Sequence, residues 1–345
     1  MPSESAKSAT RGEILFSIIV PVYNRPDEMA DLLQSMAAQS DKGFEAVVVE
    51  DGSTVPCREV CERFASEGLA VNYFYKDNEG RSIARNHGMD RARGSYFIFV
   101  DSDCVLPTDY IASLRKALSR NYTDCFGGPD AAHSSFTSTQ KAINYSMTSF
   151  LTTGGIRGGK VQLEKFVPRT FNMGFSREVY ESVGGFREMF SEDIDMSTRI
   201  RLNGYGITLF RGVVVYHKRR LGWKKFWRQV HVFGMSRITL RLLYPDSLKP
   251  VHTLPALFVV SNVVMVVLAI LFSWLWILPL ALYLLAVWIS AIVSTRSFTI
   301  GCKAVLASVI QLWGYGTGFI RAFVWKILLR HGRDEKQEIE MRRGK

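Results

Sequence analysis

Three short apolar runs in the first third of the chain each end abruptly at polar residues. Phe16–Tyr23 is followed by Asn24-Arg25, Ala46–Val49 by Glu50-Asp51-Gly52-Ser53, and Tyr96–Val100 by Asp101-Ser102-Asp103. Runs of this length that are rich in β-branched and aromatic residues are typical of strands covered on both faces. The pattern therefore predicts three buried strands, each with a polar cluster at its carboxyl end.

Helical patterns separate these strands. One helix is expected to begin near Pro26, and a second to run from about Arg81 to Arg93, with Ala84 and Gly88 placed for close packing. Alternating strands and helices predict a parallel sheet with right-handed crossovers, in which ligands bind beyond the carboxyl ends of the strands. The three polar clusters should therefore meet and form a site.

The regular alternation fails after residue 125. Residues 127–170 are rich in Gly, Ser and Thr and are expected to form loops on the acceptor side of the site. Regular structure is expected again over 172–186, in a helix that starts at the acidic stretch 191–195, and in a strand from Gly212 to His217.

Two long apolar runs near the C-terminus, Leu254–Phe272 and Ile277–Val293, approach the roughly 20 residues that a membrane-spanning helix needs. A third run, Ala304–Ile320, is interrupted by three glycines and followed by a basic piece. The positive-inside rule places residues 1–250 and the 294–303 loop in the cytoplasm. Because the basic tail would lie on the wrong side of three spans, two arrangements stay open: three spans, or two spans plus an interfacial or re-entrant segment.

Composition and charge support the membrane interpretation. The chain of 345 residues has a formal charge of +11, and much of the excess lies just before the first long apolar run: Lys218, Arg219, Arg220, Lys224, Lys225, Arg228, Arg237, Arg241 and Lys249. Basic segments in this position are attracted to anionic lipid at about 1 kcal/mol per charge, whereas nothing nearby resembles a nucleic-acid module. Five scattered cysteines and a polar start without a signal peptide fit a cytoplasmic domain.

Asp101 and Asp103 are the first candidate chemical groups. Two positions apart at a strand end, they present both carboxylates on one side and could hold Mg²⁺ or Mn²⁺ together with substrate phosphates. The alternative is a turn that ends the strand. His217, at the end of a later strand, is a candidate third ligand, although a lone histidine is more often structural.

Acidic and basic residues elsewhere provide further candidates. Asp51 could accept a hydrogen bond from a nucleobase, or could simply form a turn. Arg85, near the start of its helix, could bind a diphosphate, although a surface salt bridge is the default for a single arginine. Glu192 and Asp193 are candidate general bases, but acidic residues at a helix start are also favoured by the helix dipole alone. Asp195 is expected to pair with Arg199 one turn later, as a surface or supporting acid, and Ser191 to cap the helix.

Taken together, the pieces resemble the family 2 glycosyltransferases, the inverting group with a GT-A fold. The matching pieces are Val20–Arg25; Val49–Ser53; Asn78–Asn86 with Gly88, Ala92 and Gly94; Asp101–Asp103; Asn172–Phe175; Gly184–Phe186; and Glu192-Asp193 with Arg199, Leu202 and Gly204. Their number, order and spacing over about residues 14–240 make the resemblance specific.

The resemblance implies a role for each matching position. Pro21, Tyr23, Arg25, Asp51, Arg85 and Asp101 would bind the nucleotide-sugar, Asp103 and in some members His217 would ligate Mg²⁺ or Mn²⁺, and the Glu192-Asp193 pair would supply the base, with Asp193 preferred. The nucleotide implied most often is UDP. The basic stretch Arg219–Gln229 lacks the Gln-x-x-Arg-Trp order of processive synthases, which favours an enzyme that adds one sugar.

The predicted fold is an α/β, GT-A nucleotide-sugar-binding (Rossmann-like) mixed sheet followed by C-terminal transmembrane helices. Its parts are a disordered lead-in (1–12), the catalytic domain (13–220), basic interfacial helices (221–252), two or three transmembrane helices (253–325) and a charged tail (326–345). The expected acceptor is a hydroxyl of a lipid-linked glycan in surface polysaccharide synthesis, at the inner membrane. A polyprenyl-phosphate acceptor, or a catalytically silent nucleotide-sugar-binding membrane protein, are the alternatives.

Overall fold

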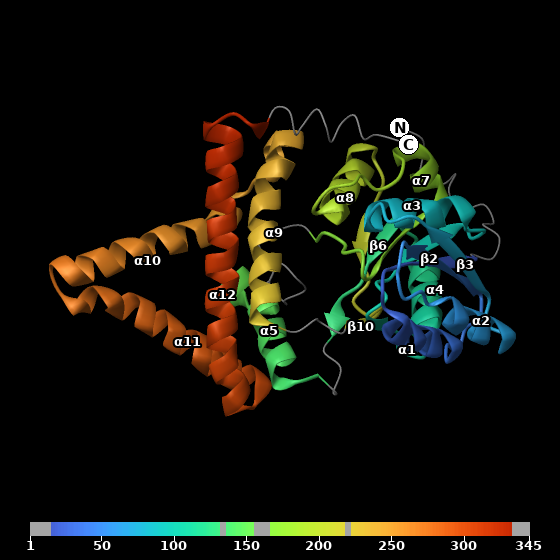
Figure 1. The fold of residues 1–345 in the computed structure, drawn as a ribbon, viewed down its shortest axis with the longest axis horizontal. Coiled ribbons are helices and arrows are strands. Elements are labelled where there is room, and N and C mark those ends of the chain that lie inside the picture. The colour runs from blue at the N-terminus through green and yellow to red at the C-terminus, as the bar shows by residue number, and fades with distance from the viewer. Residues whose placement is uncertain (1–14, 132–135, 155–165, 218–221, 333–345) are drawn as a thin grey trace.

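The computed structural model describes residues 15–131, 136–154, 166–217 and 222–332. Figure 1 shows an α/β domain on one side, a layer of long helices beside it, and a helical hairpin that points away from both. The predicted lead-in 1–12 and the last part of the charged tail lie outside the described residues, as do the basic residues 218–220.

The α/β domain is built on a seven-stranded mixed sheet with the order β3-β2-β1-β4-β8-β6-β9. β1, β2, β3 and β4 run parallel, β8 is antiparallel to β4 and β6, and β6 is parallel to β9. The bounds are β1 Phe16–Val22, β2 Phe44–Asp51, β3 Val71–Lys76, β4 Tyr96–Phe99, β6 Cys125–Gly127, β8 Met173–Ser176 and β9 Ile207–Leu209. The three predicted buried strands are β1, β2 and β4, and the predicted fold class is confirmed.

Helices cover both faces of this sheet: α1 Pro26–Ala37, α2 Arg58–Ser66, α3 Arg81–Arg91, α4 Tyr110–Arg120, α7 Arg177–Val183 and α8 Glu192–Leu202. Alternate residues of β1 point to opposite cores, so that Ile18 packs with α1 and α4 while Ile19 packs with α3. Gly88 allows α3 to approach closely, because a Cβ there would lie 2.6 Å from Cγ2 of Ile19. This contact is the close packing expected from the sequence.

A second, three-stranded sheet has the order β5-β10-β7, with β5 Cys104–Val105, β7 Asp130–Ala131 and β10 Val215–His217. β10 pairs with β5 in antiparallel register, which sets His217 opposite Cys104. The strand predicted from Gly212 is therefore shorter than expected, but it ends at the predicted histidine. Its pairing brings His217 beside Asp103.

The prediction of loops over 127–170 is wrong in part, because two helices lie there: α5 Ser138–Thr148 and α6 Phe150–Thr153. α5 begins with a capping box between Thr137 and Gln140. Its buried face, which includes Ala142 and Tyr145, packs against residues more than a hundred positions later in the chain. The sequence around α5 is polar enough to suggest a loop, and only this distant packing surface shows why it is a helix.

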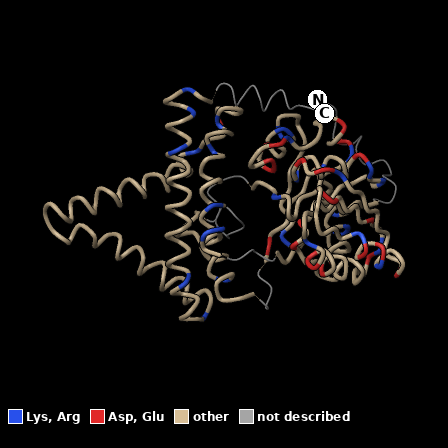
Figure 2. The backbone as a smooth tube through the Cα atoms, viewed as in Figure 1, with Lys and Arg blue, Asp and Glu red and all other residues tan. Residues whose placement is uncertain are grey.

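The remaining helices are α9 Trp223–Leu243, α10 Leu254–Leu271, α11 Leu278–Thr295 and α12 Phe298–Ala322, with short turns η2 Pro245–Ser247, η3 Pro250–Thr253, η4 Trp274–Ile277 and η5 Phe323–Leu328. Three segments are long and apolar enough to cross a membrane: Pro250–Leu271, Trp274–Thr295 and Phe298–Leu328. Figure 2 shows that the hairpin of α10 and α11 carries no charge along its length, whereas Lys and Arg residues are distributed along α9 and α12.

The tip of this hairpin exposes large apolar side chains. Ile270 is 78% exposed, Phe272 74% and Trp274 72%. The first turns of α10 contact α12, where Gly316 faces Pro255 and Val259. The last turns of α11 also contact α12, where Gly301 faces Ile292. An apolar surface of this extent requires a cover, and lipid is the cover that its length and composition suit.

The three glycines that interrupt the third apolar run lie inside the continuous helix α12. They allow neighbouring helices to approach: a Cβ on Gly314 would lie 2.4 Å from a side-chain atom of Val230, and one on Gly318 would lie 2.0 Å from the carbonyl oxygen of His231. Small residues at such crossings are typical of helices that pack in membranes. α12 is thus fixed against α9.

We expect Gly318→Ala to lower the stability of the full-length protein by about 1–3 kcal/mol, because the added methyl has no space and the helices must separate. Thermal unfolding in detergent micelles would measure this. Gly212→Ala is the control, since a Cβ there meets nothing within 4 Å. Equal unfolding midpoints for the two variants would contradict the proposed packing role.

Candidate active site

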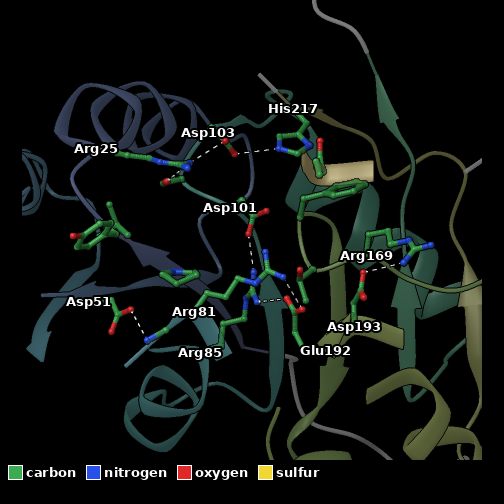
Figure 3. Close-up of a pocket in the computed structure, with 18 of the residues that line it drawn as sticks. Arg25, Asp51, Arg81, Arg85, Asp101, Asp103, Arg169, Glu192, Asp193 and His217 are labelled. Carbon is green, nitrogen blue, oxygen red and sulfur yellow. Dashed lines mark hydrogen bonds and ion pairs between the residues drawn. The ribbon is translucent and has the colours of Figure 1, made fainter. Parts of the chain in front are cut away.

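A pocket of about 640 Å³ lies at the carboxyl edge of the parallel strands, between the α/β domain and α9. All ten predicted site residues line it: Pro21, Tyr23, Arg25, Asp51, Arg85, Asp101, Asp103, Glu192, Asp193 and His217. Figure 3 shows how the charged members of this set converge from separate elements. The meeting of the strand-end clusters expected from the sequence is therefore observed, while the role of each residue stays a prediction.

Arg85 is the most buried charged side chain of the pocket, only 1% exposed. Its guanidinium donates to Asp101 over 2.8 Å and to Glu192 over 3.0 Å. Arg81 binds the other oxygen of Glu192 at 2.8 Å. Glu192 is itself 2% exposed, so both of its oxygens are occupied by arginines in a buried position. This arrangement gives Glu192 a structural role in the described chain.

Asp51 lies at the end of β2 and holds the loop that follows β3. It accepts hydrogen bonds from the backbone amides of Glu79 at 3.0 Å and Gly80 at 2.9 Å, and pairs with the ammonium of Lys76 at 3.0 Å. Gly52 has a φ of +72°, and a Cβ there would lie 2.5 Å from the amide nitrogen of Asn78. Asp51 therefore fixes the backbone at this wall of the pocket. Its position is compatible with both predicted roles of Asp51, forming a turn and binding the nucleotide.

Asp103 receives positive or polar partners on both oxygens. Arg25 lies 2.9 Å from Oδ2, and Nε2 of His217 lies 3.2 Å from Oδ1. Burial alone would raise the pKa of Asp103, but the hydrogen bond and charge of His217 and the charge of Arg25 outweigh it and lower that pKa. Asp103 is therefore an ionised carboxylate, directed into the pocket beside an imidazole.

Asp103, His217 and Cys104 offer ligand atoms within 4.8 Å of one another. Two of these residues, Asp103 and His217, suit a divalent cation. The carboxylate and the imidazole are suitable donors for Mn²⁺ or Mg²⁺. Nδ1 of His217 is buried and has no hydrogen-bond partner among the described residues, and its ring packs against Phe171 at 5.0 Å between centroids. Burial raises the pKa of the Cys104 thiol well above its usual value, so the thiol stays protonated and is a poor ligand for a hard ion.

Asp193 is more accessible than its neighbour Glu192, with 14% of its side chain exposed against 2%. Arg169 binds it at 3.1 Å, and the amide of Ile194 donates to its other oxygen at 2.8 Å. Burial opposes ionisation, but the charge and hydrogen bond of Arg169 outweigh it and lower the pKa of Asp193. Sequence reasoning missed Arg169, whose only signal is its position just before the Asn172–Phe175 piece.

Of the two positions expected for Asp195, as a surface acid or as a supporting acid, the surface position is wrong, because Asp195 is completely buried. The predicted pair with Arg199 is present at 2.9 Å, and Arg187 and the hydroxyl of Tyr244 also bind Asp195, at 3.1 and 2.7 Å. Ser191 occupies the N-cap position of α8 without a capping hydrogen bond. Its hydroxyl donates instead to Ser236 of α9 at 2.8 Å. Both contacts connect the helix that carries Asp193 to the membrane-side helices.

Residues of α9 complete the pocket on the side that faces the membrane helices: Lys225, Phe226, Gln229 and Phe233. The sequence placed this segment next to the membrane, but it gave no indication that α9 forms a wall of the site. The pocket is therefore shared between the α/β domain and the helical layer.

We expect Glu192→Gln to lower the stability of the protein by about 3–5 kcal/mol, because it breaks a buried ion pair and leaves Arg85 undercompensated. Asp193→Asn should cost much less, since Asp193 lies at the pocket wall and pairs with one arginine. Chemical unfolding of both variants beside the wild type would measure the difference. Equal losses would contradict the division into a structural and an accessible acid.

Comparison with known proteins agrees with this geometry. Residues 17–184 match the family model described as Glycosyl transferase family 2. Glycosyltransferase GlyA from Streptococcus pneumoniae is 38% identical over 108 residues, which are 31% of this chain and 16% of that protein. Glycosyltransferase AglE from Haloferax volcanii is 25% identical over 255 residues, 67% of this chain and 78% of that protein.

The chain thus spans about one sixth of the length of the pneumococcal protein GlyA. Among solved structures, the mannosyltransferase PcManGT from Pyrobaculum calidifontis, in complex with GDP-Man and Mn²⁺, is similar with a TM-score of 0.59 over 87% of each chain, at 19% identity. At this identity the similarity shows the fold, a GT-A domain followed by long helices. Residues 17–184 of this chain are a glycosyltransferase family 2 domain.

Proposed function

We propose that this protein transfers a sugar from a nucleoside-diphosphate sugar to a hydroxyl of a lipid-linked glycan in surface polysaccharide synthesis. A UDP-sugar is the first candidate for the donor. The transfer inverts the configuration at the anomeric carbon. The observation that carries the proposal is one pocket that holds an ionised Asp103 beside His217 and an accessible, ionised Asp193 on a different element. The mannosyltransferase PcManGT, which has the same fold, binds GDP-Man and Mn²⁺, and this supports a nucleotide-sugar donor and a divalent cation.

Asp103 and His217 are the residues that would hold Mg²⁺ or Mn²⁺. A cation bound there supplies positive charge next to the leaving diphosphate. Arg25, 2.9 Å from Asp103, adds a fixed positive charge at the same wall. Arg85 and Asp51, each held by two or more partners, would keep the donor-binding walls rigid.

Asp193 would act as the general base. It accepts the proton of the acceptor hydroxyl while that oxygen forms a bond to the anomeric carbon, and the bond from this carbon to the diphosphate breaks with the electron pair leaving on the nucleotide. Glu192 does not suit this task, because Arg81 and Arg85 occupy its oxygens. Asp193 has one arginine partner, and a displaced Arg169 would free its carboxylate.

A polyprenyl-phosphate acceptor is the second candidate, and Arg169 favours it, because a guanidinium next to the reacting position can bind a phosphate. Such an acceptor is already anionic and needs no base.

For the location we propose a cytoplasmic catalytic domain on the inner membrane, with the α10–α11 hairpin as the only crossing and α12 at the interface. Along its first half α12 packs against α5, where Lys303 donates to Ser138 at 2.6 Å, and along its second half it packs against α9. α12 also contacts α10 and α11. Because it is fixed along its length to α5 and α9, which we place in the cytoplasm, a position at the interface suits it better than a crossing of the bilayer. With α12 at the interface, the basic tail also stays on the cytoplasmic side.

We expect Asp193→Asn to lower the rate of transfer to a hydroxyl acceptor by about 10²–10⁴-fold, the usual contribution of a general base. Transfer at the wild-type rate would remove Asp193 from this role, and a polyprenyl phosphate would then be the better acceptor. Arg169→Gln should raise the pKa of Asp193, so that activity is lost at a higher pH on the acid side of the rate profile. An unmoved acid limb would contradict this coupling.

We expect Asp103→Ala to weaken Mn²⁺ binding by roughly tenfold or more, measured by electron paramagnetic resonance of the free ion, and His217→Ala to weaken it less. Cys104→Ala is the control and should bind Mn²⁺ as the wild type does, because its thiol is protonated. Undiminished binding by Asp103→Ala would refute the assignment.

The two arrangements in the membrane differ in the position of the C-terminus. A reporter enzyme that works only in the cytoplasm, fused after Lys345, should be active, and one that works only after export should be inactive. The opposite pair of results would establish three crossings and contradict the interfacial position of α12.

A further inference from the structure

A second cavity, of about 350 Å³, continues from the active-site pocket toward the membrane helices. Both cavities are lined by Arg169, Ser191 and Phe233, so they meet at the start of α8, one residue from Glu192 and two from Asp193. We call this second cavity the acceptor groove. Its position gives a molecule in the membrane a route to the reacting carboxylate.

The far wall of the acceptor groove is apolar. It is formed by side chains of α10, α11 and α12, including Phe258, Tyr283 and Leu312. The rings of Phe258 and Tyr283 pack at 5.5 Å, and the hydroxyl of Tyr283 donates to the carbonyl of Leu151 at 2.9 Å, which closes the wall onto α6. On the rim, Phe150 and Leu254 are 57% and 55% exposed. A hydrocarbon chain in the bilayer would meet a continuous apolar path into the groove.

The near end of the groove is cationic. Arg169 and Arg237 line it, and among the described residues that line the groove there is no carboxylate. Arg169 is neutralised by Asp193, whereas the half-buried Arg237 has no ion pair with any described residue. Two guanidiniums at the end of an apolar channel are complementary to a phosphate on a long hydrocarbon chain.

Gln311 places an unpaired polar atom in the wall of the groove. It comes from the middle of α12, is only 8% exposed, and its Oε1 accepts no hydrogen bond from any described residue. Leaving a buried amide oxygen without a donor costs about 1–3 kcal/mol, so a hydroxyl or N–H of a bound molecule would stabilise it. A purely structural gap between apolar helices would have no need of this residue.

We propose that the acceptor groove binds the acceptor as a phosphate-bearing membrane lipid, with the hydrocarbon chain along α10–α12 and the phosphate between Arg169 and Arg237. This inference rests on the proposed sugar transfer and specifies its acceptor. Phosphate at Arg169 competes with Asp193 for the guanidinium, which links occupancy of the groove to release of the base. The chemistry fits two sources: a lipid phosphate glycosylated on its own oxygen, or a lipid diphosphate whose attached glycan supplies the hydroxyl.

The test is binding of a long-chain isoprenyl phosphate to the full-length protein in nanodiscs of zwitterionic lipid, with the matching isoprenol and inorganic phosphate as comparison probes. We expect the isoprenyl phosphate to bind more tightly than either, and Arg237→Gln to weaken it roughly tenfold or more, the effect of one charge-assisted hydrogen bond. Arg237→Lys should retain part of this affinity. This result would show that the weaker binding of Arg237→Gln is not caused by misfolding. Leu312→Trp, which fills the apolar wall, should also weaken binding.

Arg241→Gln is the matched control, because Arg241 lies one turn along the same helix, is exposed and lines neither cavity. Equal affinities of Arg237→Gln and Arg241→Gln would overturn the proposal. So would isoprenol that binds as tightly as the phosphate, or inorganic phosphate that displaces the lipid at similar concentration.

Hydrolysis of nucleotide-sugars by the same preparations separates this inference from the proposed function. Lipid binding as expected without turnover of any donor would refute sugar transfer and leave the groove in place, whereas donor turnover without lipid binding would refute the groove alone. Product on the isoprenyl phosphate itself would identify the first lipid source. Product only with a glycan-bearing lipid diphosphate would identify the second.

Discussion

The ion pairs of one buried guanidinium position most of the active site. Arg85 comes from α3, and it binds Asp101 at the end of β4 and Glu192 at the start of α8. Removing either acid would leave a buried charge undercompensated, so the three elements are held in one geometry. The two carboxylates to which we assign chemistry lie beside these anchored acids in sequence: Asp103 two residues after Asp101, and Asp193 directly after Glu192.

A second buried network fixes the other side of α8. Asp195 binds Arg187, Arg199 and the hydroxyl of Tyr244, and the last of these belongs to the segment that follows α9. The start of α8 is thus held both by the sheet domain, through Glu192, and by α9 and the segment after it, through Ser191 and Asp195. Since α9 also supplies a wall of the pocket, the catalytic geometry depends on the layer that contacts the membrane. This dependence gives a physical reason for a catalytic domain and an apolar hairpin to share one chain.

Much of this arrangement could be predicted from the sequence, because it depends on local periodicity and on a rule of topology. The apolar runs that became β1, β2 and β4 are short and uniform, and the carboxyl ends of parallel strands necessarily lie together. Nine of the ten site residues therefore came from strand ends and from one acidic helix start, the tenth, Arg85, came from α3, and all ten line the pocket.

The features that could not be predicted depend on contacts between distant residues. Arg169 is one arginine among many until its distance to Asp193 is known. The helix α5 is stable because Ala142 and Tyr145 meet α11 and α12, and the glycines of α12 look like interruptions until their contacts with α9 and α10 are seen. Asp195 has the spacing of a surface pair, and only the position of Tyr244 shows that it is buried.

The central claim is that one pocket, completed by the membrane-side helices, transfers a sugar to a lipid-bound acceptor. The most direct measurement is incubation of the full-length protein and Mn²⁺ with a panel of nucleotide-sugars and a membrane-lipid extract, with product masses read in the organic phase. The account predicts a lipid species that gains the mass of one sugar residue, with release of the matching nucleoside diphosphate. Free sugar as the only product, or no product with any donor, would contradict it.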